Sequence, residues 1–301
     1  MRPNASYRLK SSGGGIRNPG KIEPDGALTS VGTLVLLIHG YNNDEGEAER
    51  SYEQFFTRQE EIAPVFANVV SVYWSGDNWE GAVYYMQAIS KAKDTAPLLA
   101  ADLCKAATAK GYLSVNIIAH SLGCRLALET IEQVKKILMN DPAPIPIIIS
   151  SVIFMAGAVP VSYIDNNKDG RLRAALEKAG KTMSMYSKKD TVLHWAFGIG
   201  ESLGGDGFFP RALGRKYWEA GDLVPVKMRQ EENTGAGHSD YWGGDSKKTE
   251  QLKRAAGYIR SFVDLGTPPP RTVEARSIDA SETIPARETT QGRTVDVREV
   301  C

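Results

Sequence analysis

The sequence predicts an α/β protein with a mostly parallel, doubly wound sheet and helices on both faces. Short segments rich in Val, Ile and Leu alternate with longer segments whose apolar residues recur at helical spacing. Residues 33–38, TLVLLI, form a continuous apolar run, which is typical of a strand buried on both faces. The chain has 301 residues, of which 42% are hydrophobic, so a large core is available. Strands that alternate with helices imply right-handed βαβ units, and ligands then lie beyond the carboxyl ends of the strands.

The individual elements follow from apolar patterning. Tyr52, Phe55 and Phe56 fall on one face of a helix that follows the first buried strand. Pro97 lacks a backbone N–H, so we expect it to break the long helix that contains it. The predicted strands span residues 33–38, 68–74, 113–119, 146–155, 182–186 and 224–228, and the predicted helices span residues 48–62, 82–110, 122–139, 172–179 and 252–263.

The chain divides into a central domain and two flanking segments. Residues 1–30, rich in Gly, Pro and Ser, are expected to be mostly irregular, with a short edge hairpin as the alternative. Residues 31–265 form the α/β domain, in which residues 192–237 show no clean period and are expected to form a small irregular cap. Residues 266–301 contain no Phe, Trp or Tyr and are predicted to be a disordered tail.

Composition excludes several classes of protein. The 36 basic residues balance the 36 acidic ones, so a nucleic-acid partner is not expected. The three cysteines are scattered without a CxxC pair, which argues against a disulfide framework or structural zinc and fits a reducing compartment. We see no signal peptide and no apolar run long enough for a membrane span. A cytoplasmic protein without metal or organic cofactor is therefore expected.

Residues 119–123, AHSLG, follow the strand at 113–119 directly and open a helix. The pattern resembles G-x-S-x-G, the nucleophile elbow, with Ala119 in place of the first glycine. The small residues Ala119 and Gly123 let the turn close, and the strained turn thrusts Ser121 outward. The alternative is that Ser121 only caps the helix.

The first buried strand ends in Ile38-His39-Gly40-Tyr41. An HG pair at this place lets the next backbone N–H face the attacked carbonyl, so Tyr41 and Leu122 are the predicted oxyanion donors. His39 is expected to brace this loop.

The base and acid must come from later in the chain. His120 is next to Ser121 and points away from it, so the choice lies between His194 and His238, and we favour His238, in a flexible loop before the last helix. His194 is expected to line the pocket. Asp190 follows the strand at 182–186 and gives the order Ser121, Asp190, His238, with Asp165 as the alternative acid. Asp240 is expected to serve its own loop.

With these pieces placed, the chain resembles the α/β-hydrolase superfamily over about residues 30–265. HGYNN, VYWSGD, NIIAHSLGCRLALE and GHSDYW are similar to a bacterial group of serine hydrolases of the DUF900 type. The resemblance implies a lipase-like fold, Ser121, Asp190 and His238 as catalytic triad, and Tyr41 and Leu122 as oxyanion donors.

The expected activity is hydrolysis of a small-molecule or lipid acyl ester through an acyl-enzyme. A thioesterase, amidase or acyltransferase would use the same residues, and a protein-interaction module whose tail binds a partner is the alternative from another class. Trp74, Trp79 and Trp195 are candidates for an apolar acyl pocket, although such aromatics also pack cores.

Overall fold

The computed structural model describes residues 5–10, 15–29, 32–41, 44–62, 68–76, 82–141, 145–165, 170–194, 211–215, 228–242 and 249–263. The chain separates into a unit of residues 1–268 and a unit of residues 269–301. The second unit lies wholly outside the described residues, so the disordered tail and its partner stay predictions. Trp79, Trp195 and most of the expected cap also lie outside them.

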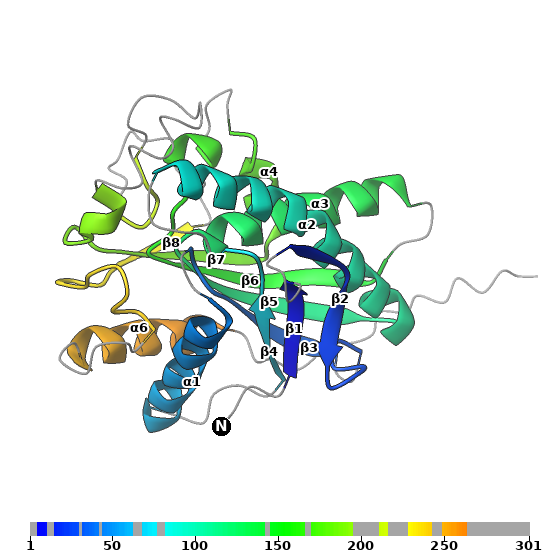
Figure 1. The fold of residues 1–301 in the computed structure, drawn as a ribbon, viewed down its shortest axis with the longest axis horizontal. Coiled ribbons are helices and arrows are strands. Elements are labelled where there is room, and N and C mark those ends of the chain that lie inside the picture. The colour runs from blue at the N-terminus through cyan, green and yellow to red at the C-terminus, as the bar shows by residue number, and fades with distance from the viewer. Residues whose placement is uncertain are drawn as a thin grey trace, which may run out of the picture. The chain divides into compact units, whose positions relative to one another are not determined.

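An eight-stranded sheet with the order β2-β1-β4-β3-β5-β6-β7-β8 forms the centre of the protein. All neighbouring strands are parallel except the edge strand β2, which runs antiparallel to β1. Figure 1 shows the sheet edge-on between two layers of helices. The strands are β1 (Ala5–Lys10), β2 (Ile16–Glu23), β3 (Thr33–Ile38), β4 (Val69–Tyr73), β5 (Leu113–His120), β6 (Ile147–Met155), β7 (Lys181–Tyr186) and β8 (Met228–Glu232).

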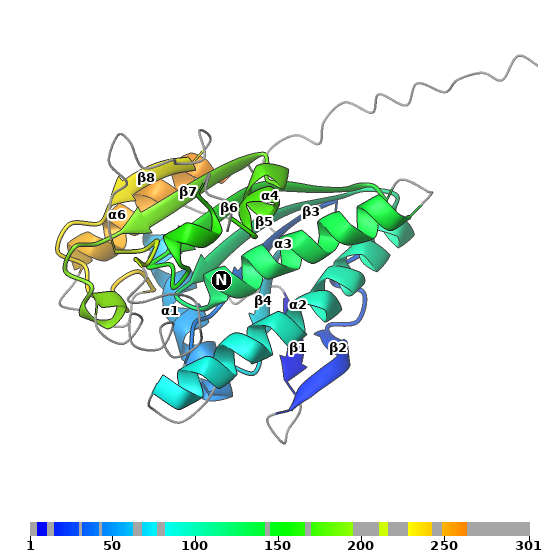
Figure 2. The ribbon, with the colours of Figure 1, turned by 90° about the horizontal axis from the view of Figure 1, so that it is seen from above.

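Helices cover both faces of the sheet, as the doubly wound prediction required. In Figures 1 and 2, α1 and α6 lie on one face and α2, α3 and α4 on the other. This arrangement buries every residue of β4 and of β5. The helices are α1 (Glu45–Ile62), α2 (Ala82–Lys110), α3 (Gly123–Asn140), α4 (Arg173–Lys178) and α6 (Thr249–Phe262), with a short 3-10 helix, η1 (Val161–Tyr163), after β6.

The structure corrects two sequence expectations about local elements. Residues 5–10 and 16–23 are not irregular, because they form a hairpin whose inner strand β1 extends the parallel sheet beside β4. Ala5, Tyr7 and Leu9 alternate with more exposed residues along β1, which is the period of a strand buried on one face. Helix α2 is not broken at Pro97, since one helix of 29 residues passes through it.

The last predicted strand is displaced along the chain. β8 begins at Met228, where the predicted strand at 224–228 ends, and residues 224–227 lie outside the described residues. Because β8 pairs in parallel with β7, it completes the edge of the sheet next to the loop that holds Asp190. Across the described residues, no helix is both long and apolar enough to cross a bilayer.

Candidate active site

Ser121 lies on a strained turn between β5 and α3. Its backbone φ is +52°, in the left-handed region that non-glycine residues seldom occupy. The Ser121 N–H donates to the Met155 carbonyl at 2.9 Å, and its own carbonyl accepts from Ala158 N–H at 3.0 Å. These contacts with the end of β6 and the loop after it fix the turn. A backbone that is strained but held from both sides is typical of a functional site.

The two residues that flank this turn are both small. A Cβ at Gly123 would lie 2.3 Å from the His39 carbonyl oxygen and 2.8 Å from that of Ile38, so only glycine fits there. Ala119 is fully buried inside β5, paired with Ile38 on one side and Phe154 on the other. The alanine in place of glycine therefore fits within the sheet.

The loop after β3 passes directly over Ser121. A Cβ at Gly40 would lie 2.7 Å from the Ser121 Cβ, which places the Gly40 backbone against the serine. Tyr41 follows, and its ring packs edge-on against Tyr85 of α2, with centroids 5.6 Å apart. Leu122, at the start of α3, donates no backbone N–H hydrogen bond within the part of the chain that the structure describes. The backbone at Gly40 and the start of α3 at Leu122 thus both lie beside Ser121.

His39 is held on all sides and stiffens this loop. Its Nδ1–H donates to the Gly40 carbonyl at 2.8 Å, and its backbone N–H donates to the Tyr52 hydroxyl at 3.0 Å. The Trp74 indole N–H donates to the His39 carbonyl at 3.0 Å, and the two rings stack with centroids 5.7 Å apart. The Tyr52 hydroxyl in turn donates to the Val72 carbonyl at 2.6 Å. Burial of the Tyr52 hydroxyl raises the pKa of Tyr52. His39, held by these contacts, therefore braces the loop.

Trp74 is 1% exposed, and its indole is packed against this loop. The proposal that Trp74 lines an acyl pocket stays a prediction, and what the structure describes is a bracing contact. A hollow beside it is lined by charged and aromatic residues, and its two basic residues, Arg8 and Lys10, are matched by two acidic ones, Asp44 and Glu45. The lining residues are Arg8, Lys10, His39, Asp44, Glu45, Tyr73 and Trp74.

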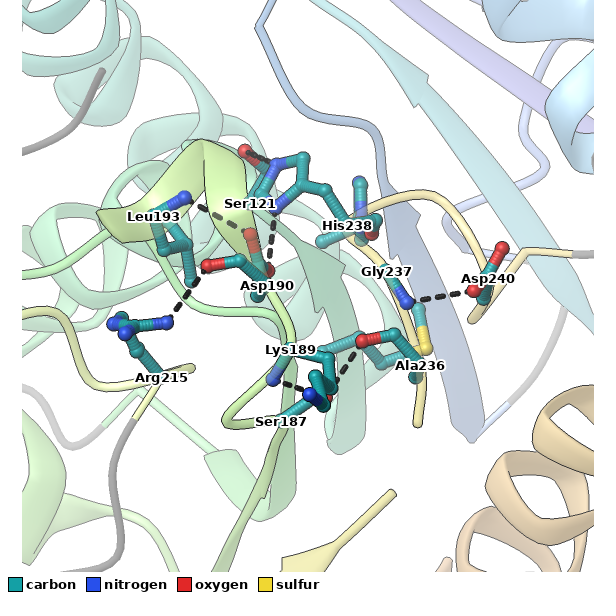
Figure 3. Close-up of polar contacts among 12 residues, drawn as sticks. Ser121, Ser187, Lys189, Asp190, Leu193, Arg215, Ala236, Gly237, His238 and Asp240 are labelled. Atoms are coloured by element: carbon teal, nitrogen blue, oxygen red, sulfur yellow. Dashed lines mark hydrogen bonds and ion pairs between the residues drawn. The ribbon is translucent and has the colours of Figure 1, made fainter. Parts of the chain in front are cut away.

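His238 reaches Ser121 from the loop between β8 and α6. Its Nε2 lies 2.8 Å from Ser121 Oγ, and its Nδ1 lies 2.8 Å from Asp190 Oδ2 (Figure 3). An ionised carboxylate only accepts, so Nδ1 carries the proton and Nε2 accepts from the serine hydroxyl. Three side chains, from the turn after β5, the loop after β7 and the loop after β8, thus form one hydrogen-bonded line.

Asp190 is fully buried and both of its oxygens are occupied. Oδ2 faces His238, while Oδ1 accepts the Leu193 N–H at 2.9 Å and so caps the helical turn at residues 191–194. Asp165, the alternative acid, lies after η1 and is partly exposed. The carboxylate in contact with His238 is that of Asp190.

A few hydrogen bonds hold the loops that carry Asp190 and His238. Ser187 Oγ donates to the Ala236 carbonyl at 2.6 Å, and Arg215 Nη1 donates to the carbonyls of Lys188 and Asp190, each at 3.0 Å (Figure 3). Asp240 Oδ2 accepts the Gly237 N–H at 2.6 Å, so Asp240 serves its own loop, as expected.

Sequence reasoning missed Arg215, which no motif marks. His194 ends the helical turn after Asp190 with an exposed side chain, and its role in a pocket stays a prediction. Across the described residues, no group of three or more His, Cys, Asp or Glu side chains is placed to hold a metal ion.

The parallel sheet, its two helical layers and a serine on a strained strand-to-helix turn define an α/β hydrolase. The chain belongs to the family of α/β hydrolases of unknown function designated DUF900, whose model matches residues 27–203. No curated protein matches the sequence.

Solved structures that resemble the chain are distant in sequence. A hydrolase from Agrobacterium vitis S4, described as putative, is 10% identical, with a TM-score of 0.42 over 82% of this chain and 96% of that one. The carboxylesterase CesB (YbfK) from Bacillus subtilis is 9% identical, with a TM-score of 0.34 over 79% and 85% of the two chains. A Staphylococcus aureus protein described as a putative esterase is 10% identical, with a TM-score of 0.35 over 78% and 79%. At these identities and scores, the function has to be argued from the site.

Proposed function

We propose that this α/β hydrolase is a serine esterase that cleaves a small-molecule or lipid acyl ester through a Ser121–His238–Asp190 triad. The supporting observation is the continuous line of two 2.8 Å contacts from Ser121 Oγ through His238 to Asp190. A hydroxyl is a weak nucleophile unless an adjacent base takes its proton, and His238 Nε2 is in place to do so.

Acylation starts when Ser121 Oγ attacks the ester carbonyl carbon and its proton passes to His238 Nε2. Asp190 holds the imidazole in the required tautomer and stabilises the imidazolium that forms. The negative charge that develops on the carbonyl oxygen is met by the backbone N–H groups of Leu122 and Tyr41. His238 then gives the proton to the departing alkoxide, which leaves as an alcohol, and the acyl group remains on Ser121.

Deacylation repeats these steps with water as nucleophile. His238 takes a proton from water as the hydroxide attacks the acyl carbonyl, and then returns it to Ser121 Oγ, which releases the carboxylic acid. The same residues can cleave an ester, a thioester or an amide. The substrate pocket selects among these, and assays with each class of substrate identify the preferred one.

The test is turnover of p-nitrophenyl esters of short and long acyl chains by the full-length protein. Ser121→Ala should lower kcat/KM at least about 10⁴-fold, since the nucleophile is lost. Ser261→Ala, in an exposed serine on α6, is the matched control and should stay within about twofold of the wild type.

Labelling of the intact protein by a fluorophosphonate complements the turnover assay. We expect one adduct in the wild type and none in Ser121→Ala. Full ester turnover by Ser121→Ala, or labelling at another serine, would reject the assignment. A parallel panel of thioesters and amides would show which acyl bond is cleaved fastest.

A further inference from the structure

His120 lies immediately before Ser121, and the proposed mechanism gives it no task. Its side chain is buried under the loop that carries His238, with the two imidazole rings 5.0 Å apart. The rings of Tyr241 and Trp242, on the same loop, lie 6.4 Å and 5.5 Å from it. Burial of a polar imidazole costs free energy unless hydrogen bonds compensate for it, so the partners of this ring are informative.

The hydrogen bonds of His120 fix its tautomer. Its Nε2 lies 2.8 Å from the main-chain carbonyl oxygen of His238. A carbonyl only accepts, so Nε2 carries the hydrogen and Nδ1 is bare. Nδ1 is buried and has no hydrogen-bond partner among the described residues. One nitrogen of this ring is thus committed to the chain at His238.

His120 is also a neutral ring. Burial lowers its pKa to about 3, and the neighbouring charges of His238 and His39 act in the same direction, while the bond to the His238 carbonyl opposes them. The ring therefore stays uncharged at neutral pH and adds no positive charge next to His238 when that residue takes a proton. A charged neighbour would disfavour the imidazolium on which the proposed reaction depends.

We propose that His120 is a positioning residue that tethers the main chain at His238 to the turn that carries Ser121. The inference rests on the proposed function. Because His120 and Ser121 are adjacent in the chain, one turn presents both the nucleophile and the anchor of its base. The distance between Ser121 Oγ and His238 Nε2 is then set within one local unit, although 117 residues separate the two in sequence.

Other contacts hold this loop at residues on either side of His238, and Trp242 packs against Tyr52 and Phe55. Ser187 binds at Ala236 and Asp240 binds at Gly237, both ahead of His238. The bond from His120 is made to His238 itself. Displacement of a reacting group by about 1 Å can cost about 100-fold in rate, so loss of this anchor should be visible in kcat.

The test compares His120→Gln with His120→Met in the full-length protein. Both variants lose the ring and have similar volume, but only the Gln amide N–H₂ can donate to the His238 carbonyl from the position of Nε2. We expect kcat for p-nitrophenyl esters to be at least tenfold higher in His120→Gln than in His120→Met, with KM values that agree within about twofold. Equal kcat values in the two variants would overturn the proposal.

A second measurement needs no activity. In the wild type labelled with ¹⁵N-histidine, the imidazole signals that disappear in His120→Gln should show the neutral Nε2–H tautomer down to pH 5. A Nδ1–H tautomer, or titration of this ring near pH 6.5, would contradict the tether. If the tautomer is as expected but the wild type neither cleaves esters nor reacts with a fluorophosphonate at Ser121, the proposed function fails instead.

Discussion

The carboxyl edge of the sheet holds two regions that are built differently. The oxyanion region, Ile38–Tyr41 with Trp74 and the Ser121 turn, is buried between strand ends and held by hydrogen bonds to the sheet. The loops of the proposed acid and base, residues 187–194 and 233–242 (the acid–base loops), lie mostly outside the strands. Ser187 joins them through the Ala236 carbonyl, and Arg215 holds the first from a third segment. Both regions contain buried residues, but the strand ends hold the first in place, whereas the second depends on hydrogen bonds between loops.

This difference predicts how changes in the two regions should affect the protein. A change in the oxyanion region removes contacts of the core, so stability and activity should fall together. A change to a polar group of the acid–base loops alters the position or protonation of His238 and keeps the buried apolar side chains of these loops, so activity should fall with little change in stability. The predictions below test that separation, starting with the largest effect.

The largest expected effect in the acid–base loops comes from Asp190→Asn. The side chain keeps its shape, but its amide N–H₂ can turn toward His238 Nδ1 and favour the wrong tautomer of the base. We expect kcat/KM to fall by about 10⁴-fold, and the midpoint of thermal unfolding to change by only a few degrees. The value of kcat/KM is measured from ester turnover, and the midpoint is measured by thermal denaturation.

Asp165→Asn is the matched control for that prediction. Asp165 is partly exposed after η1, and the carboxylate that contacts His238 belongs to Asp190. Turnover by this variant should stay within about threefold of the wild type. A greater loss of turnover in Asp165→Asn than in Asp190→Asn would show that Asp190 is not the acid of the triad.

A smaller loss of activity, together with a loss of stability, is expected in the oxyanion region from Trp74→Phe. Phenylalanine keeps an aromatic ring beside His39 but lacks the indole N–H that donates to the His39 carbonyl. Loss of one buried hydrogen bond costs about 1 kcal/mol in the free energy of unfolding. We expect that loss in urea denaturation, and a fall in kcat/KM of about tenfold because the oxyanion loop is less well fixed. Unchanged stability with lowered activity would break the comparison.

The oxyanion region is also the part of the site that sequence reasoning predicts most directly. The AHSLG turn and the HG pair each lie within a few residues of a buried strand end, so local chain geometry nearly determines their place. The two segments approach each other so closely that a side chain at Gly40 or Gly123 would collide with the other segment, and both positions are therefore glycine. Contiguous motifs are therefore enough to bring this half together.

The acid–base loops are less accessible to sequence reasoning. Asp190 is suggested by chain order, because parallel strands end at one edge, but nothing local distinguishes its carboxylate from that of Asp165. The tie from Arg215 joins two segments 25 residues apart without any pattern. The tether from His120 to the His238 carbonyl is likewise a contact between a side chain and a distant backbone, which no residue type announces.

The prediction that residues 1–30 are mostly irregular is wrong for a different reason. The Gly- and Pro-rich composition of residues 1–30 favoured an irregular segment, although the alternation of Ala5, Tyr7 and Leu9 along β1 carries the period of a half-buried strand. Composition averages over a window, whereas alternation is a property of position. The expected break at Pro97 failed for another reason, since it rested on one missing N–H, and the packing of a helix of 29 residues outweighs the loss of one hydrogen bond.

The smallest effect is expected from Arg215→Ala. Arg215 Nη1 holds the carbonyls of Lys188 and Asp190, so it fixes the backbone of the acid's loop without touching the carboxylate. Leu193 N–H and His238 still hold that carboxylate after the change. We therefore expect kcat to fall by about three- to tenfold with KM and the unfolding midpoint nearly unchanged. Arg173→Ala, in an exposed arginine that pairs with Glu177 on α4, is the control and should leave kcat unaltered. A large loss of stability in Arg215→Ala would mean that the hydrogen bonds of this loop stabilise the fold as strongly as those of the oxyanion region, and the two regions would no longer differ in kind.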